Sequence, residues 1–242
     1  NGLISSYRQQ CMAYADDIVL MTRSRKELVK MFKNLETTAR EYGLRINEEK
    51  TKYMEVRTGD KEETKILDIK TDNNKQYTFA RVSQFEYLGV TLTNNCQEEI
   101  EINKRITKGS RAVGALIGIL KSKLVSKSTK IRIYRTVIRP TVTYGCEVWV
   151  LNKQSEAKLE IWERKILRKI LGGVKEEGIG WRRRTNQEVM EMYNRPSVSH
   201  AVRLQRLRWL GHVVRMDENK QIKKVLTMGE GGKKKRGRPK RK

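Results

Sequence analysis

Two adjacent aspartates, Asp16 and Asp17, interrupt an otherwise apolar stretch, and they constrain the fold of this chain more than any other feature. Short β-prone runs lie on either side of the pair, at residues 10–14 and 18–21. Two such runs that meet at a polar turn predict a β-hairpin with the carboxylates at its tip. Adjacent carboxylates repel each other unless a cation lies between them, and hard oxygen ligands suit Mg²⁺. A solvated turn that holds two aspartates is the alternative.

The charge balance predicts the kind of partner. The 242 residues include 53 Lys and Arg against 28 Asp and Glu, which gives a net charge of +25. An excess of this size predicts a polyanionic partner, and nucleic acid is the commonest one. No apolar run approaches the roughly 20 residues of a membrane span, so we expect no membrane partner. Three widely spaced cysteines, Cys11, Cys96 and Cys146, predict reduced thiols in an intracellular compartment.

The residues after the hairpin predict one helix and further strands. Ser24 and Glu27 form a capping-box pattern, apolar residues then recur at helical spacing to Tyr42, and Gly43 is a natural helix stop. We expect strands over residues 51–57, 66–70, 76–83 and 85–92. This order predicts an α+β fold, in which the helix packs on an antiparallel sheet of the palm type.

Residues 98–171 predict three helices. The first places apolar residues on one seam between Ile102 and Leu120. The second begins near Ser126 and is expected to end at Pro140, and the third ends at Leu171, before two glycines. Many arginines and lysines lie off these apolar stripes, so we expect a helical bundle with a basic face. A bundle whose charges are merely solvated is the alternative.

The C-terminal part predicts a linker, two helices and a tail. Residues 175–196 are polar and glycine-spaced, which indicates a linker with a short helix. Ser197 is expected to cap a helix, and a last short helix follows near residue 222. Eight of the ten residues 233–242 are basic, which predicts disorder. Its Gly-Arg-Pro string is similar to an AT-hook and to a nuclear localisation signal, and a nonspecific basic tail is the alternative.

The string Tyr14-Ala15-Asp16-Asp17 resembles the catalytic hairpin of reverse transcriptases, whose signature is an aromatic residue, any residue and then Asp-Asp. Alanine in the second place is the form typical of non-LTR (LINE-type) retrotransposons. Further strings of the chain are similar to the same family. They are Gly43-Leu44-x-x-Asn47-x-x-Lys50-Thr51, Tyr87-Leu88-Gly89, Tyr144-Gly145-x-Glu147-x-Trp149, Glu163-Arg164-Lys165-x-Leu167-Arg168-x-Ile170 and Arg206-Leu207-x-Trp209-x-Gly211-His212-Val213.

The resemblance implies an RNA-directed DNA polymerase that uses two Mg²⁺ ions in nucleotidyl transfer. Asp16 and Asp17 would be the catalytic metal ligands, and Lys50 would offset triphosphate charge or donate a proton to the leaving pyrophosphate. The residues implied to border the primer end and the incoming nucleotide are Tyr14, Ala15, Tyr87, Leu88 and Gly89. The alternatives are a helix cap followed by a solvated lysine, and an ordinary strand with a bulge glycine.

The resemblance also implies a domain order and partners. Residues 1–95 would form the C-terminal part of the palm and 96–174 a helical thumb, followed by a linker and helical region at 175–228 and a disordered basic tail at 229–242. The thumb and tail would bind an RNA template and a DNA primer or target, and deoxynucleoside triphosphates would be the substrates. The implied nucleic-acid-binding residues are Arg105, Lys108, Arg111, Arg164, Arg168, Arg236, Arg238 and Lys240. The implied location is the nucleus, after passage through the cytoplasm.

One departure from the family pattern limits this interpretation. The family takes a further catalytic aspartate from a strand upstream of the hairpin, and the fingers region also lies upstream. The resemblance covers nearly the whole chain but only the C-terminal part of the family's polymerase, so we expect no polymerase activity from these 242 residues alone. The alternative function is a non-catalytic, basic nucleic-acid-binding protein derived from such an element.

Overall fold

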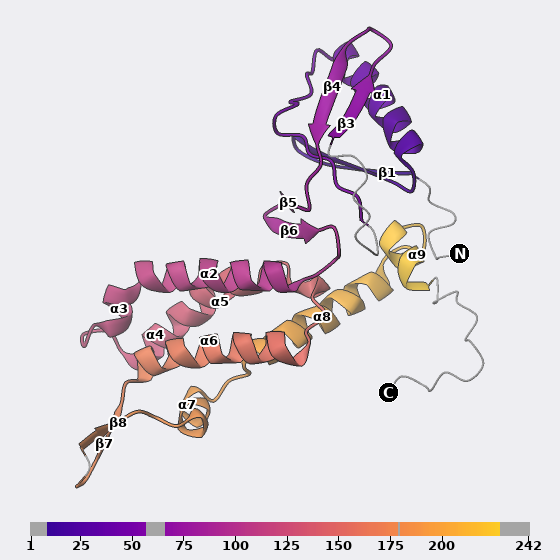
Figure 1. Cartoon of the computed structure of the whole chain (residues 1–242). Helices are drawn as coiled ribbons and strands as arrows, with labels where there is room; N and C mark the ends of the chain where they lie inside the picture. Colours follow the sequence, from indigo (N-terminus) through magenta and orange to yellow (C-terminus); the bar gives the residue numbers. More distant parts are fainter. Residues whose placement is uncertain (1–8, 57–65, 179, 228–242) are drawn as a thin grey trace, which may run out of the picture. The chain divides into compact units, whose positions relative to one another are not determined.

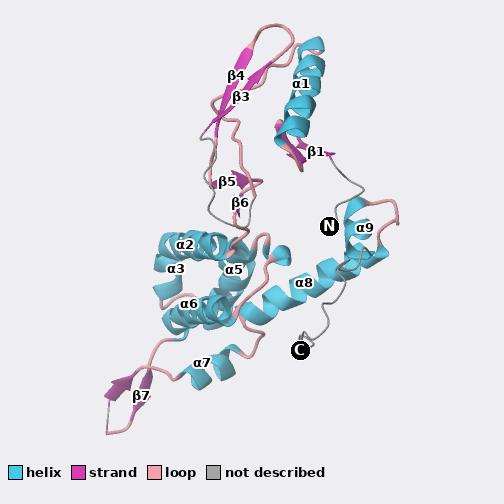
Figure 2. Cartoon of the chain, turned by 45° about the vertical axis from the view of Figure 1, so that its right-hand side comes forward, coloured by secondary structure: helices cyan, strands magenta, loops and turns pink. Residues whose placement is uncertain are grey.

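The computed structural model describes residues 9–56, 66–178 and 180–227, and the chain divides into two units (Figure 1). One unit comprises residues 1–85 with 213–242, and the other comprises residues 86–212. The mixture of helices with small antiparallel sheets confirms the predicted α+β class (Figure 2). The functional boundaries predicted at residues 95, 174 and 228 stay predictions. The predicted disordered tail lies outside the described residues.

Two hairpins and one helix make up the N-terminal part of the first unit. Strands β1 (Gln9–Tyr14) and β2 (Asp17–Thr22) pair antiparallel, and so do β3 (Ile66–Lys70) and β4 (Gln76–Ala80). Between the hairpins lies helix α1 (Arg25–Glu41). The two predicted hairpins and the helix are therefore confirmed.

The ends of α1 are those that its sequence predicts. The Ser24 hydroxyl oxygen accepts a hydrogen bond from the Glu27 backbone N–H at 3.2 Å, which satisfies one of the unpaired N–H groups of the first turn. At the other end, Gly43 has a φ of +72° and donates its N–H to the Arg40 carbonyl oxygen at 2.9 Å. A glycine stops the helix there because it enters the left-handed region without a Cβ clash.

An aromatic cluster forms the core of the first unit. The ring of Phe32 from α1 meets Tyr77 and Phe79 of β4 edge-on, each at a centroid distance of 5.1 Å. Edge-to-face rings at this distance add to the stabilisation from burial. Leu20 of β2 packs against this cluster. The hairpin that carries the acid pair is thus anchored to the core by its second strand.

The strand predicted at 51–57 is wrong. Within the described residues this segment contributes only an isolated parallel bridge, between Tyr53 and Arg81. Thr51 is still held in a turn, because its N–H and hydroxyl both donate to the Asn47 carbonyl oxygen. Too few extended residues follow that turn to form a ladder, although Tyr53 is buried in the core.

The second unit begins with a hairpin and continues as a helical bundle. Strands β5 (Gln84–Tyr87) and β6 (Val90–Thr93) form the hairpin, and the boundary between the units falls inside β5. The bundle elements are α2 (Glu99–Ala115), α3 (Ile117–Lys121), α4 (Lys127–Ile133), a π-helical turn (Tyr134–Ile138), α5 (Arg139–Thr143), a 3-10 turn (Cys146–Val148) and α6 (Lys153–Leu171).

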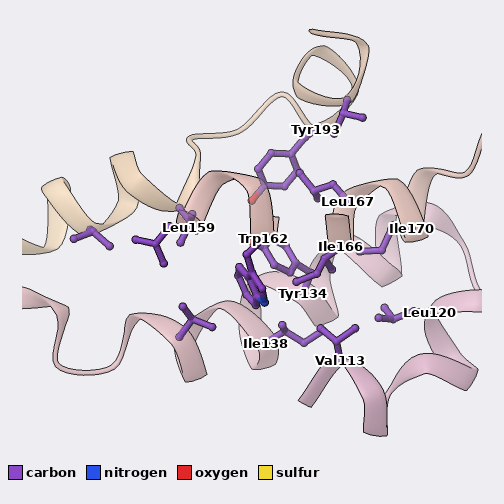
Figure 3. Close-up of a cluster of buried hydrophobic side chains, with 14 of the residues drawn as sticks. Val113, Leu120, Tyr134, Ile138, Leu159, Trp162, Ile166, Leu167, Ile170 and Tyr193 are labelled. Atoms are coloured by element: carbon purple, nitrogen blue, oxygen red, sulfur yellow. The ribbon is translucent and has the colours of Figure 1, made fainter. Parts of the chain in front are cut away.

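Helices α2, α5 and α6 pack closely enough to require a glycine at their contact. Figure 3 shows the surrounding core, in which Tyr134 and Trp162 lie among aliphatic side chains. A Cβ atom on Gly109 of α2 would lie 2.2 Å from Val142 Cγ2 and 2.8 Å from the Trp162 ring. Ile102 and Leu120 are both buried, so the predicted apolar seam is confirmed. The single helix predicted to carry it is wrong, because α2 ends at Ala115 and Leu120 belongs to the separate helix α3.

Pro140 does not end the second helix, contrary to the prediction. The chain passes from α4 through the π-helical turn into α5, where Pro140 lies in the first turn. Proline lacks an N–H to donate, and its ring clashes with the carbonyl four residues earlier in a regular helix. The wider π turn directly before α5 shifts the hydrogen-bond ladder and accommodates the ring. Val142 of α5 remains fully buried as a result.

The C-terminal region is more structured than predicted. The expected linker contains a hairpin of β7 (Val174–Glu176) and β8 (Gly180–Arg182), and then the short helix α7 (Asn186–Tyr193). Helices α8 (Val198–Arg215) and α9 (Gln221–Thr227) follow, as expected. Among the described residues, every helix is too short or too polar to span a lipid bilayer.

Candidate functional site

The acid pair lies at the turn of the β1–β2 hairpin, as predicted. Tyr14 pairs with Asp17 at the end of the ladder, so a two-residue turn of Ala15 and Asp16 connects the strands. Ala15 has a φ of 52°, and Asp16 lies outside the left-handed region. A positive φ at the first turn residue alone matches the right-handed twist of a hairpin. The alanine is strained there, because its Cβ approaches the backbone.

The turn presents its side chains to solvent. Tyr14 is 66% exposed, and Ala15, Asp16 and Asp17 are exposed as well. Among the described residues, no group of three or more His, Cys, Asp and Glu side chains is placed to hold a metal ion. The turn therefore offers two hard oxygen ligands, which suit Mg²⁺ but are fewer than a closed protein site would need.

Lys50 lies on an ordered loop of the same unit. The Asn47 side-chain oxygen accepts the Lys50 backbone N–H at 3.0 Å, and Glu48 accepts the backbone N–H of Thr78 in β4. These bonds fix the backbone of the loop, while Lys50 itself is exposed. In the string that resembles the family, Asn47 therefore has a structural role, and the exposed side chain of Lys50 can contact an anion.

Tyr87, Leu88 and Gly89, which were predicted to border the primer, lie at a second tight turn instead of in a continuous strand. Tyr87 ends β5 and Val90 begins β6, so Leu88 and Gly89 make a two-residue connection. Their φ angles are 48° and 76°. Positive φ at both positions defines the type I′ hairpin turn, which favours glycine at its second residue. The strand predicted over 85–92 is therefore two strands, and its glycine is a turn residue.

A buried ion pair supports this second turn. Arg105 Nε donates to Glu101 Oε1 at 2.5 Å, and both side chains are almost fully buried. The Arg105 guanidinium also donates to the Gly89 carbonyl oxygen, and the backbone N–H of Thr91 donates to Glu101 Oε2 at 2.8 Å. Burial raises the pKa of Glu101, but the hydrogen bonds from Arg105 and Thr91 outweigh it and hold the pKa below its usual value.

Tyr144, which directly follows α5, contacts the same turn. Its hydroxyl donates to the Leu88 carbonyl oxygen at 3.0 Å, and the Arg105 guanidinium carbon lies 4.6 Å from its ring centroid. The following Gly145 has a φ of 71°, and a Cβ there would lie 3.0 Å from Val90 Cγ2. Two strings that are distant in sequence, Tyr-Leu-Gly and Tyr-Gly-x-Glu-x-Trp, therefore fold against each other.

The predicted nucleic-acid-binding residues fall into four groups. Arg105 is 5% exposed and internally bonded, so it differs from the exposed basic face expected for it. Lys108 and Arg111 are exposed, and Lys108 forms an ion pair with Glu86 at 3.3 Å. Arg164 and Arg168 are half-buried on α6. The remaining three, Arg236, Arg238 and Lys240, lie outside the described residues.

The sequence did not identify Glu101 as a site residue, and it identified Tyr144 only as part of a string similar to the family. Glu101 precedes Arg105 by four residues on a helix, the spacing at which a Glu–Arg pair meets. That pattern identifies a pair but not its burial, because the covering residue Tyr144 comes from about forty residues further along the chain. Only the fold shows that the pair bonds to the Leu88–Gly89 turn region.

Part of the chain matches a known protein family. Residues 1–92 match the family described as reverse transcriptase (RNA-dependent DNA polymerase). This segment contains both turns and the Lys50 loop. A Caenorhabditis elegans protein described as an uncharacterized transposon-derived protein is 26% identical over 214 residues, which cover 86% of this chain and 73% of the relative. No solved structure matches the chain. The two matches confirm the predicted resemblance to a retrotransposon reverse transcriptase.

Proposed function

We propose that this chain is the C-terminal palm and thumb of a non-LTR retrotransposon reverse transcriptase, which extends a DNA primer on an RNA template. The observation that carries the proposal is the exposed Asp16–Asp17 turn inside a segment that matches the reverse transcriptase family. Exposed carboxylates at the tip of a hairpin can reach a bound substrate. The substrates would be deoxynucleoside triphosphates.

The donor set of the turn fits the metal that this reaction uses. Asp16 and Asp17 would hold Mg²⁺, which binds oxygen ligands and keeps part of its shell for substrate phosphates. Two such ions, when bound, stabilise the attacking and leaving oxygens of an in-line displacement. Two carboxylates from one turn are too few for two ions, and the described residues contribute no third ligand. A further carboxylate from outside the described residues would complete the site.

The other residues of the site would act on substrate and primer. The exposed Lys50 ammonium would bind triphosphate oxygens and offset their charge, or donate a proton to the leaving pyrophosphate. Tyr14 and Ala15 would border the primer end. The backbone at Leu88 and Gly89, held by Arg105 and Tyr144, would bind the primer strand. The nucleus is the proposed location, because target DNA would serve as the primer.

The second candidate function is nucleic-acid binding without catalysis. The observation that favours it is the lack of a third metal ligand among the described residues. The net charge of +25 suits either function. The two functions differ in one respect, because only the polymerase needs the charges of Asp16 and Asp17.

Primer extension tests the proposal. The chain joined to a reverse transcriptase palm strand that supplies a further catalytic aspartate, together with a fingers region, is expected to extend an RNA-templated DNA primer in Mg²⁺. Asp16→Asn in that chain is expected to lower the rate at least about a hundredfold, since it removes one preorganised charge from the site. The 242-residue chain by itself is expected to show no extension above background.

The matched control is Asp72→Asn. Asp72 is 81% exposed at the turn of the other hairpin of the same unit, where it pairs with Lys33 at 3.1 Å. This variant removes the same charge from a comparable turn, and its rate is expected to stay within about twofold of the unmodified chain, since an exposed ion pair contributes little. Equal losses in the two variants, or a near-normal rate for Asp16→Asn, would contradict the assignment of the metal site.

A further inference from the structure

A basic groove lies in the second unit between the C-terminal half of α6 and the segment that joins β8 to α7. Two adjoining hollows make up this groove, with volumes of about 460 and 450 Å³. Both are lined by Lys165 and Arg168 of α6 and by Arg183 and Arg184 beyond β8. Lys169 and Gly173 complete one hollow, and Arg164 belongs to the other. Charges far apart in the sequence are therefore gathered on one surface.

Of the groove cations, Arg164 pairs with Glu160 at 3.4 Å, and the others form no ion pair with a carboxylate among the described residues. Arg168 donates to the Arg184 carbonyl oxygen at 3.1 Å and to Asn186 Oδ1 at 2.5 Å, both of which are neutral acceptors. Partial burial, and then the positive charges of Arg183 and Arg164, lower the pKa of Arg168. The Nε of Arg184 is buried and has no hydrogen-bond acceptor. A surface that concentrates unneutralised donors in this way is complementary to phosphate.

The neighbouring Arg182 differs from the groove cations because it pairs with two carboxylates. Its guanidinium donates to Glu188 Oε1 at 2.7 Å and to Glu176, so its charge is neutralised. The hydrogen bond from Arg182 also lowers the pKa of Glu188 to about 2. This network joins the β7–β8 hairpin to the first turn of α7. It holds one wall of the groove in place without using the groove cations.

An exposed tryptophan stands beside the basic groove. Trp181 of β8 is 76% exposed. It lies against Gly173, where an added Cβ would be 3.3 Å from Trp181 Cε3. Its partner across the hairpin is Lys175, so both side chains are on the same face of the ribbon. An aromatic face beside a row of cations is the combination that binds unpaired bases together with their phosphates.

We propose that this basic groove, with Trp181, binds single-stranded nucleic acid. Phosphates would contact Lys165, Arg168, Lys169, Arg183 and Arg184, and one base would stack on the indole ring. The groove is distinct from the acid hairpin and needs neither metal nor nucleotide. In the context of the proposed polymerase it would hold an unpaired stretch of template or displaced strand. The binding itself does not depend on that function.

The test uses the full 242-residue chain in EDTA, without nucleotides. Its ligands are a 20-nucleotide oligo-dT, a 20-base-pair duplex and inorganic polyphosphate, which carries charge but no bases. Trp181→Ala is expected to weaken oligo-dT binding about fivefold or more, since stacking on one aromatic ring contributes that much. Its affinity for polyphosphate is expected to stay unchanged. Trp181→Phe is expected to retain most of the oligo-dT affinity, because it keeps an aromatic face.

The charge arm uses Lys165→Gln with Arg183→Gln, two exposed residues without a hydrogen bond in the described part of the chain. The matched control is Lys123→Gln with Arg132→Gln, an exposed Lys and Arg of the same unit. The groove pair is expected to weaken oligo-dT binding about tenfold at physiological salt and to reduce its salt slope by about one. The control pair is expected to cause less than half of that change in slope.

Two results would overturn the proposal. One is an oligo-dT affinity unchanged by Trp181→Ala, or lowered only in proportion to duplex and polyphosphate affinity. The other is an equal effect of the groove and control pairs, which would assign the binding to diffuse charge. Because no metal or nucleotide is present, these results are separate from the outcome of primer extension with Asp16→Asn.

Discussion

The two tight turns of the reverse-transcriptase-like segment have the same length and opposite surroundings. Each is a two-residue hairpin connection whose first residue has a positive φ, 52° at Ala15 and 48° at Leu88. The Ala15–Asp16 turn presents two carboxylates to solvent. The Leu88–Gly89 turn is held at both carbonyl oxygens, by Tyr144 and by Arg105.

The difference separates two exposed carboxylates from a buried charge pair that holds a turn in place. At the first turn two like charges lie next to each other, and among the described residues neither forms an ion pair, so a bound cation would relieve their repulsion. At the second turn the charges of Glu101 and Arg105 compensate each other inside the protein. Substitutions at the first turn should therefore affect function, and substitutions around the second should affect stability.

The largest effect on stability is expected from Glu101→Gln. A glutamine has one acceptor oxygen, so it cannot serve both the Arg105 guanidinium and the Thr91 N–H, and Arg105 is left as a buried, uncompensated charge. The free energy of unfolding of the second unit is expected to fall by about 3 kcal/mol. Chemical denaturation, followed through the buried tryptophans of this unit, measures it.

Two substitutions of exposed acids test whether the effect of Glu101→Gln depends on burial. Glu86→Gln removes the partner of Lys108, a pair that joins β5 to α2, but that pair is about half exposed, so the expected cost is below about 0.5 kcal/mol. Asp16→Asn at the solvent-exposed turn is expected to leave unfolding within about 0.5 kcal/mol of the unmodified chain. If Glu101→Gln is as mild as these two, the buried pair does not support the second turn.

Acid is expected to distinguish the buried pair from the exposed acids. Because the folded pKa of Glu101 lies below its usual value of 4.5, its contribution to stability is present above that pH. The contribution is lost as the pH falls through the lower folded pKa. The difference in unfolding free energy between the unmodified chain and Glu101→Gln should thus be constant above about pH 5 and shrink below pH 4.5. A difference that grows on acidification would contradict this sign.

A smaller effect than that of Glu101→Gln is expected from Tyr144→Phe. This variant loses the hydrogen bond to the Leu88 carbonyl oxygen but keeps the ring that Arg105 covers. The expected loss is about 0.5–1 kcal/mol, since Tyr144 is 53% exposed and water replaces part of the bond. Faster hydrogen exchange at the amides of residues 88–91 should accompany it, and exchange at residues 14–17 should not change.

Local signals in the sequence predicted much of the fold. The ends of α1 follow from Ser24 and Gly43, and the end of α6 follows from Gly172, because a cap depends on residues within one turn. The errors arose at an irregular helical turn and at a segment whose pairing partner is distant in sequence. Pro140 continues a helix only because a π turn precedes it, and residues near Tyr53 form a bridge instead of a strand.

Part of the candidate site could be predicted from the sequence, and part could not. The turn at Asp16 follows from the short β-prone runs on either side of the two acids, and the structure confirms it. The burial of Arg105 was not predictable, since an arginine off an apolar seam usually faces solvent. The basic groove was not predictable either, because it joins α6 to Arg183 and Arg184 through the unpredicted β7–β8 hairpin.

The most direct test of the central claim is the paramagnetic broadening of backbone amide signals by Mn²⁺, a divalent stand-in for Mg²⁺. In the 242-residue chain, the signals of Ala15, Asp16 and Asp17 are expected to broaden at lower Mn²⁺ than those around the exposed Asp72. The double variant Asp16→Asn with Asp17→Asn should abolish that preference and leave the rest of the spectrum unchanged. Equal broadening at both turns, or selective broadening that persists in the double variant, would show that the acid hairpin is not the metal site.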